Sequence, residues 1–299
     1  MLNLFVDNLL PVFLAAGAGY VLAWRLGVDP RPISQLAFFV LAPCLVFQIV
    51  LDSGVPGEAM LRLVLFTMSG MLMLGGLAAG VALWLGWSRT CTAAVVLVVL
   101  LPNAGNLGLS VNLFAFGDEG LARASIYFIT SAVLTFTVGV FVASMGRSGL
   151  KRTLIGMLKV PALWSVPVAI LLLQAGWRLP LPLGRTVELL SQASIPVFLV
   201  VLGMQLYGKG IGGPWGPLVL CCGLRLLGGV AVGLALAALL GLDDVARQAG
   251  VLQSAMPSAV ITTVLATEYD VEPAMVTSAV IITTMLSPLT LTPLLAYLG

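Results

Sequence analysis

The sequence predicts an all-α membrane protein with ten transmembrane helices, arranged as a 5+5 inverted repeat. The 299 residues are 60% hydrophobic and only 9% charged, whereas soluble domains carry about 25% charged residues. The mean hydropathy is +1.11. Ten apolar stretches follow one another between short polar turns, and a helix needs about 20 such residues to cross a bilayer. Two of the stretches are interrupted by proline at corresponding positions in the two halves of the chain.

The first apolar stretch is interpreted as a span, because it lacks the preceding Lys or Arg of a cleaved signal peptide. The ten expected spans cover residues 4–24, 33–51, 59–87, 91–116, 121–145, 160–177, 186–207, 215–240, 249–267 and 273–298. They form a first five-helix repeat over residues 1–149 and a second over residues 150–299. Because five is an odd number, the two repeats have opposite orientations in the membrane, as in many secondary transporters.

The fourth span carries a polar interruption at its centre. Pro102 removes a helical hydrogen bond and clashes with the preceding turn, and Gly105 lowers the cost of leaving helical geometry. Asn103 and Asn106 add side-chain amides to the same stretch. Backbone groups freed at membrane depth are tolerated only where they are buried in protein or line a water-filled cavity. We therefore expect a broken helix whose break builds a polar site at mid-depth.

The second half of the chain repeats this pattern in the same order. Three pairs of features correspond: Pro43 with Pro196, Leu101–Ala104 with Met256–Ala259, and Asp118 with Asp270. The offset between partners is nearly constant at about 150 residues, and interrupted helices at matching positions of two halves are the best sequence indication of a midplane binding site. The alternative is two unrelated proline kinks in a ten-helix protein.

Lys and Arg in the turns indicate the orientation, since cytoplasmic loops carry an excess of them. Eight lie on one side: Arg25, Arg31, Arg89, Arg147, Lys151, Arg152, Lys159 and Lys209. Five lie on the other: Arg62, Arg123, Arg178, Arg185 and Arg247. We expect the richer side to be cytoplasmic and both termini to lie outside.

At this point the chain resembles a known family, the auxin efflux carriers of bacteria and plants, whose wider relatives are the bile acid/sodium symporters. The resemblance rests on Pro102-Asn103-Ala104-Gly105-Asn106-Leu107-Gly108 in the fourth span and on Ala255-Met256-Pro257-Ser258-Ala259 in the ninth. It covers essentially the whole chain. The fourth-span motif is fairly specific, whereas the ninth-span motif alone would be weak.

The resemblance implies that helices 4 and 9 cross at their breaks. It also implies a scaffold domain of helices 1, 2, 6 and 7, a transport domain of helices 3–5 and 8–10, and a homodimer through the scaffold. Family members move organic anions, such as auxin in plants and malate or malonate in some bacterial members. The chain would then belong in a bacterial cytoplasmic membrane.

The physical chemistry of a broken helix supports an anion as ligand. The second half of such a helix begins with free N–H groups and a partial positive charge, which suit a carboxylate. The expected substrate-binding residues are those of the two breaks: Pro102, Asn103, Gly105, Asn106, Pro257, Ser258 and Ala259. Thr262 and Thr263 are weaker candidates. The alternative for these asparagine and serine side chains is that they only satisfy the backbone at a kink.

Two further sites have competing interpretations. Glu58 and Arg62 are spaced to pair on one helical face, and some plant members of the resembled family have an acid–base pair near the substrate. They are a candidate coupling switch, or else a solvated ion pair of little energetic value. Arg225 lies within the eighth span, where a charge is a functional candidate by default. The competing account is that Arg225 extends to the headgroups.

Gln253 is also a candidate coupling residue, because it precedes the ninth-span break by about one helical turn. In the sodium-coupled relatives a carboxylate occupies that neighbourhood. Its absence here favours proton coupling or uniport over sodium coupling. Ser125, Thr130 and Ser131 on the fifth span could still supply oxygen ligands to an ion. A bile-acid-type sodium symporter therefore remains an alternative.

Composition excludes several other classes. The chain has no His, and its four Cys lie in apolar runs without zinc-ligand spacing, so we expect no metal and no cofactor. A net charge of +2 is too small to indicate nucleic acid. A membrane enzyme would need paired acids or a His- or Cys-based nucleophile at depth. The sequence thus predicts an elevator-type secondary transporter of a small organic anion, with a transporter-like sensor or a channel as the other class.

Overall fold

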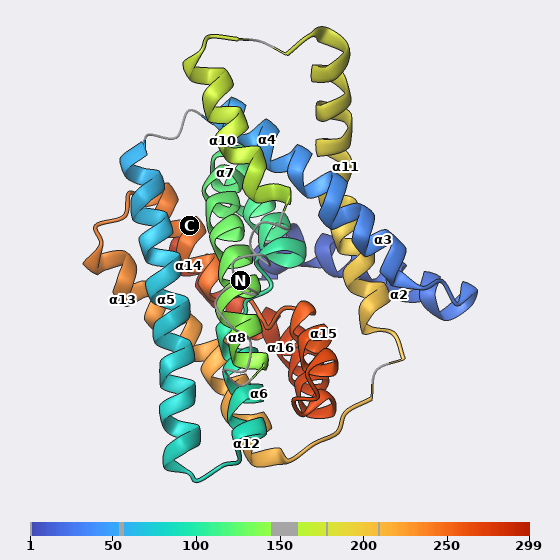
Figure 1. Ribbon diagram of the computed structural model, residues 1–299, viewed down its shortest axis with the longest axis vertical. Helices are drawn as coiled ribbons and strands as arrows, with labels where there is room; N and C mark the ends of the chain where they lie inside the picture. Colours follow the sequence, from blue (N-terminus) through green and yellow to red (C-terminus); the bar gives the residue numbers. More distant parts are fainter. Residues whose placement is uncertain (1, 54–56, 145–160, 178, 209) are drawn as a thin grey trace.

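The computed structural model describes residues 2–53, 57–144, 161–177, 179–208 and 210–299 (Figure 1). Within these ranges every regular element is a helix, and the only extended pairing is a single antiparallel bridge between Pro102 and Ser258. Six of the basic residues used for the orientation lie outside the described residues: Arg147, Lys151, Arg152, Lys159, Arg178 and Lys209. The orientation therefore stays a prediction.

The N-terminal part of the chain folds into helices that begin and end at the polar turns of the sequence. These elements are α1 (Leu2–Leu4), η1 (Phe5–Leu9), α2 (Leu10–Leu26), α3 (Pro30–Leu36), η2 (Ala37–Leu41), α4 (Ala42–Ser53), α5 (Gly57–Trp84), α6 (Arg89–Leu100), η3 (Ala104–Leu109), α7 (Ser110–Leu134), η4 (Thr135–Gly139) and α8 (Val140–Ala143). The elements named η are π-helical turns. Asp29 and Ser88 cap α3 and α6 by accepting bonds from the Arg31 and Cys91 amides, as short polar residues do at helix starts.

The C-terminal part follows the same principle. Its elements are α10 (Pro161–Gln174), α11 (Leu181–Leu206), α12 (Trp215–Gly223), η5 (Leu224–Gly228), α13 (Gly229–Leu239), α14 (Asp244–Ser254), α15 (Ile261–Glu268) and α16 (Pro273–Leu298). Asp243 caps α14 by accepting a bond from the Ala246 amide. Helix α16 covers the range expected for the last span.

In the part of the chain that the structure describes, seven helical segments are long and apolar enough to cross a membrane by length and composition. They are Leu2–Leu26, Pro30–Asp52, Gly57–Trp84, Ala104–Ala143, Leu181–Leu206, Trp215–Leu239 and Pro273–Leu298. The protein is thus a helical integral membrane protein. The shorter apolar helix α6 and the pair α14 and α15 belong to the two expected spans that are broken.

Helix α7 is not straight at the turn expected between the fourth and fifth spans. Gly117 has φ 64° and ψ −159° inside it, so helical geometry is lost at this residue. A positive φ is the conformation that glycine adopts at little cost. The expected turn at residues 117–120 is therefore present as a single non-helical residue between two helical stretches.

Close packing of α2 against α11 depends on two glycines. A Cβ at Gly19 would lie 1.9 Å from the carbonyl oxygen of Val200, and one at Gly203 would lie 1.6 Å from that of Ala16. Small residues let membrane helices approach to backbone contact. The π-helical turn η2 joins this pair, because Ser194 of α11 donates to the carbonyl of Leu41 at 3.0 Å.

The helices fall into two packing neighbourhoods. Helices α2, α3, α4, α10 and α11 pack on one another, and α10 lies beside α4 (Figure 1). Helices α5, α6, α7, α12, α13, α14, α15 and α16 form the other neighbourhood. The two meet mainly where α11 contacts η3 and where α4 contacts α7. The breaks of the fourth and ninth spans lie inside the second neighbourhood.

Candidate functional site

The first break separates α6 from η3 at residues 101–103. Leu101 has φ −103° and ψ 94°, an extended conformation, because the ring of the following proline disfavours helical geometry in the residue before it. Asn103 also leaves the helical region, with φ −76° and ψ 60°. The three residues are buried.

The second break lies between the end of α14 at Ser254 and the start of α15 at Ile261. The Ala255 amide still bonds to the carbonyl of Val251 at 3.1 Å, and the Met256 amide bonds to that of Gln253 at 3.2 Å. Pro257 has no N–H to extend the helix further. The helix breaks thus fall at the two prolines that the sequence singled out.

The two breaks bond to each other through the backbone. The Asn103 amide donates to the carbonyl of Pro257 at 2.7 Å, and the Ala259 amide donates to the carbonyl of Leu101 at 2.9 Å. These bonds make the bridge between Pro102 and Ser258. Two breaks that lie about 150 residues apart in the sequence therefore form one buried polar centre, and each satisfies backbone groups that the other exposes.

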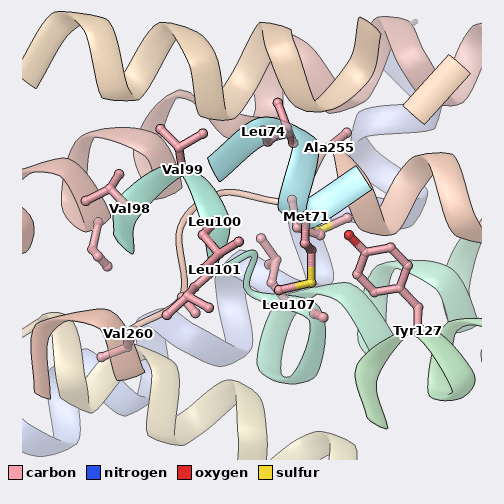
Figure 2. Close-up of a cluster of buried hydrophobic side chains, with 14 of the residues drawn as sticks. Met71, Leu74, Val98, Val99, Leu100, Leu101, Leu107, Tyr127, Ala255 and Val260 are labelled. Atoms are coloured by element: carbon pink, nitrogen blue, oxygen red, sulfur yellow. The ribbon is translucent and has the colours of Figure 1, made fainter. Parts of the chain in front are cut away.

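Apolar side chains enclose this centre. Val98, Val99, Leu100 and Leu101 of the first break lie with Met71 and Leu74 of α5, with Leu107, and with Ala255 and Val260 of the second break (Figure 2). All of these side chains are at most 8% exposed. Electrostatic interactions are stronger in such a medium than in water. Each polar group at the breaks therefore interacts strongly with a charged ligand.

The side chain of Asn103 carries a hydrogen-bond donor that no described residue of this centre accepts. Its side chain is 4% exposed, and its amide Nδ2 has no partner among the described residues. Asn103 precedes η3 without capping it, and α15 likewise begins without a side-chain cap. Neither half-helix therefore has a side-chain cap among the described residues, although the Ala104 and Thr262 amides donate to the Pro102 and Ala259 carbonyls. An acceptor such as a carboxylate would satisfy the buried Asn103 amide.

Gly105 and Asn106 follow in η3 and are half-buried. A Cβ at Gly105 would lie 2.9 Å from the ring of Phe128, so glycine there allows η3 to pack against α7. The backbone carbonyl of Asn106 accepts a bond from the Ser110 hydroxyl at 3.0 Å. Of the four substrate-binding residues expected at this break, Pro102 and Asn103 are the more deeply buried.

At the second break, Ser258 is fully buried and its amide donates to the hydroxyl of Thr283 on α16 at 3.2 Å. Its own hydroxyl lies 3.5 Å from that of Thr262, also fully buried. Thr263 is half-buried, and its hydroxyl donates to the Val260 carbonyl at 2.8 Å. Of the expected polar residues, Ser258 and Thr262 lie together and Thr263 bonds to its own helix.

Gln253 links three segments next to the breaks. It is fully buried, and its Nε2 donates to the carbonyl of Ala104 at 3.1 Å and to that of Ala124 at 3.2 Å. A Cβ at Gly108 would lie 2.1 Å from its Oε1, so the glycine of the motif makes room for this amide. Its Oε1 has no hydrogen-bond partner among the described residues.

Arg225 is fully buried in η5, which excludes the alternative that its charge reaches the headgroups. Its Nη1 donates to the carbonyl of Val99 at 2.6 Å, and its Nη2 donates to the carbonyl of Ser254. These carbonyls belong to the last turns of α6 and α14. The guanidinium thus lies at the C-terminal ends of both half-helices, where partial negative charge accumulates.

The ion pair predicted between Glu58 and Arg62 is present, with 2.7 Å between Oε1 and Nη2. Its side chains are 76% and 46% exposed, and Arg62 also donates to the carbonyl of Gly241 at 2.8 Å. Helix α5 passes the first break at Gly75, where a Cβ would lie 3.1 Å from Leu100. At 1.5 Å per residue, Arg62 lies about 20 Å along the helix from that point. The pair is not in contact with the breaks.

The hydroxyls considered as ion ligands on the fifth span bond to their own helix. Ser125 donates to the Leu121 carbonyl and Thr130 to the Ile126 carbonyl, each at 2.8 Å. Ser131 donates to the Phe128 carbonyl at 2.8 Å. This is the usual way for a membrane helix to satisfy a hydroxyl.

The structure adds three polar residues to the site that sequence reasoning did not select. Asn112 is fully buried and its Nδ2 donates to the carbonyl of Gly108 at 2.7 Å. Thr283 bonds to Ser258, and neighbouring Thr284 has a buried hydroxyl without a partner among the described residues. An intramembrane Asn was a visible signal for Asn112. The two threonines gave none, because hydroxyls are common in membrane helices.

Comparison with known proteins identifies the family. The family model described as membrane transport protein matches residues 143–295. The chain belongs to this family, which is that of the auxin efflux carriers. The resemblance expected from the two break motifs is thereby confirmed.

Two relatives of this chain are also described as transporters. An uncharacterized transporter of Methanocaldococcus jannaschii is 31% identical over 199 residues, which is 64% of each chain. The match therefore spans slightly less than two thirds of that relative. An uncharacterized transporter of Methanothermobacter thermautotrophicus is 27% identical over 293 residues, which is 94% of each chain.

Proposed function

We propose that this transporter carries a small organic anion across a bacterial cytoplasmic membrane and binds it at the paired helix breaks. The substrate class is a carboxylate such as malate, malonate or an auxin-like acid. The observation that carries the proposal is the buried side-chain amide of Asn103, which has no hydrogen-bond partner among the described residues and stands at the start of an uncapped half-helix. A carboxylate oxygen would accept from this side-chain amide and from backbone amides of the first turn of η3 that follow Ala104, whose own amide already donates to the Pro102 carbonyl at 2.8 Å.

Charge supports an anion over a cation. Neither break contains Asp or Glu, and Arg225 contributes a buried positive charge at the opposite ends of the half-helices. This charge offsets the partial negative charge of those ends, so the partial positive charge of the half-helix N-termini dominates at the breaks. The centre therefore attracts negative charge without a basic side chain at the ligand itself.

Alternating access is proposed to occur by an elevator movement within a ten-helix inverted repeat whose fourth and ninth helices cross at their breaks. The packing neighbourhood of α2, α3, α4, α10 and α11 would be the scaffold, and the neighbourhood of α5–α7 and α12–α16 would be the transport domain. What supports this division is that both breaks and Arg225 lie within the second neighbourhood, which could move with its ligand as one body. The homodimer through the scaffold remains part of this proposal.

Coupling to a proton, or uniport, is preferred over coupling to sodium because no carboxylate accompanies Gln253 at the second break. The exposed Glu58–Arg62 pair bonds to the turn after α13, so it could respond to movement between α5 and α13. It stays a candidate switch. A sensor that binds the anion without moving it is the second class, and a channel is opposed by the apolar enclosure of the breaks.

Uptake into proteoliposomes tests the proposal. Purified protein would be offered labelled malate, malonate and indole-3-acetate, each with an imposed proton gradient, with an imposed sodium gradient and with neither. We expect uptake of at least one anion that does not depend on sodium. Absence of uptake with retained binding would support the sensor, and absence of both uptake and binding for all three acids would contradict the assigned substrate class.

A further inference from the structure

Arg225 lies at a position of the fold where a bare cation would otherwise be favoured. Its two terminal nitrogens donate to the carbonyls of Val99 and Ser254, in the last turns of α6 and α14. The last carbonyls of a helix have no intrahelical partner and carry partial negative charge. In broken-helix transporters generally, such carbonyls coordinate the coupling cation.

The charge of Arg225 is compensated by these carbonyls and not by an acid. The side chain is fully buried, and no carboxylate of the described residues forms an ion pair with it. An uncompensated buried charge is expensive, and an ionised side chain in a membrane helix is a functional candidate. The two helix ends therefore provide the counter-charge, and removal of the guanidinium would leave them facing each other.

The surrounding helices hold the guanidinium in place. A Cβ at Gly229 would lie 2.7 Å from Arg225 Nη2 and 2.4 Å from the Ser254 carbonyl oxygen, so only glycine fits there. A Cβ at Gly233 would lie 2.1 Å from the Ser254 hydroxyl, which in turn donates to the Gly229 carbonyl at 2.9 Å. The glycines of α13 thus bring the end of α14 against the helix that carries Arg225.

We propose that the guanidinium of Arg225 is a built-in cation that occupies the place of a coupling ion between the C-terminal ends of α6 and α14. It fixes the two half-helices relative to each other, and it makes the breaks independent of sodium. Arg225 is thus a positioning residue, because it acts on the ligand through the half-helices and does not touch it. The structural part of the inference stands alone, whereas its consequence for anion affinity rests on the proposed function.

Thermal unfolding of the purified full chain in detergent tests the structural part. Arg225→Ala should lower the melting temperature by about 5 °C or more, and guanidinium at about 10 mM should restore part of the loss by binding the vacated site. The wild type and the matched variant Arg185→Ala, which removes an exposed arginine of α11, should show no such rescue. The melting temperature of Arg225→Lys should lie between those of the wild type and Arg225→Ala, because an ammonium lacks the planar fork that reaches two carbonyls.

Two results would overturn the inference: an Arg225→Ala protein that melts with the wild type, or a destabilised one that guanidinium does not rescue. If Arg225→Ala does not fold, the melting temperature of the wild type in two salts tests the inference instead. This temperature should be the same in sodium chloride and choline chloride, and a specific stabilisation by sodium would refute a built-in cation.

Binding of labelled malate, malonate and indole-3-acetate tests the consequence. Arg225→Ala should bind the transported acid at least 10-fold more weakly, with partial rescue by guanidinium, whereas Arg185→Ala should bind normally. Failure of the wild type to bind any of these acids would contradict the proposed function. The structural role of Arg225 would then be tested by the melting data alone. Sodium-dependent binding by the wild type would contradict the inference itself.

Discussion

Asn103 and Arg225 are both buried polar side chains beside the breaks, but they lie at opposite electrical ends of the half-helices. Asn103 stands at the start of η3, where free amides carry partial positive charge, and its side-chain Nδ2 has no partner among the residues that the structure describes. Arg225 stands at the ends of α6 and α14 and neutralises their carbonyls. The result is a centre whose positive helix ends remain open and whose negative ends are occupied.

Asn103→Ala should weaken anion binding by at least about 10-fold, because it removes a buried hydrogen bond to a charged group. Asn103→Asp should abolish binding, since it places a negative charge beside the ligand. Isothermal titration of the purified protein with the transported acid measures both effects. Ser69→Ala, whose hydroxyl bonds only to its own helix α5, is the control. Wild-type affinity in Asn103→Ala would show that the carboxylate binds elsewhere.

Residue chemistry was partly visible in the sequence. Pro102, Asn103 and Gly108 could be selected because proline, amides and glycine are unusual together inside an apolar run. Gln253 was selected by its place before Pro257, but its bonds to Ala104 and Ala124 join segments far apart in the chain. For Arg225 the sequence left two accounts open, because burial is a property of the packed helices.

At the scale of elements, helix starts and ends followed local rules. Asp29, Ser88 and Asp243 cap their helices, and Gly27 ends α2 with φ 61°, a left-handed conformation typical of glycine at helix C-termini. What local rules do not provide is the packing of helices against one another. In a membrane, close approach depends on where small residues of two helices meet.

Helices α2 and α11 should tolerate no side chain at their crossing. Gly203→Leu should prevent normal folding, because even a Cβ there would lie 1.6 Å from the Ala16 carbonyl oxygen. Gly17→Leu is the matched control, since a Cβ at Gly17 meets nothing within 4 Å. Size-exclusion profiles and yields of the two variants would be compared. Equal, monodisperse peaks would contradict the close crossing.

At the scale of the whole molecule, the two breaks bring the two halves of the chain into one centre. The paired bonds from Asn103 to Pro257 and from Ala259 to Leu101 are the direct link between them. Five spans in each half would give a protein with both termini on one side of the membrane. The excess of Lys and Arg in alternate loops predicts that this side is outside.

Topology can be tested without knowledge of the substrate. Cells would express the chain with a small epitope at the N-terminus or at the C-terminus, and an impermeant antibody would be applied before and after permeabilisation. We expect both epitopes to be accessible in intact cells. Termini on opposite sides would contradict an even number of spans, and two cytoplasmic termini would contradict the orientation alone.

Hydropathy, proline and glycine act locally on the chain, so the membrane class, the family and the positions of the two breaks could be predicted from the sequence alone. The sequence also determined the Glu58–Arg62 ion pair, which depends only on helical spacing. Helix packing, in contrast, brings the two breaks into hydrogen-bonding contact, places Gln253 and Thr283 beside them, and puts Arg225 between two helix C-termini. These contacts join residues on different helices, and helix packing, which sets them, is not encoded in any single stretch of the chain.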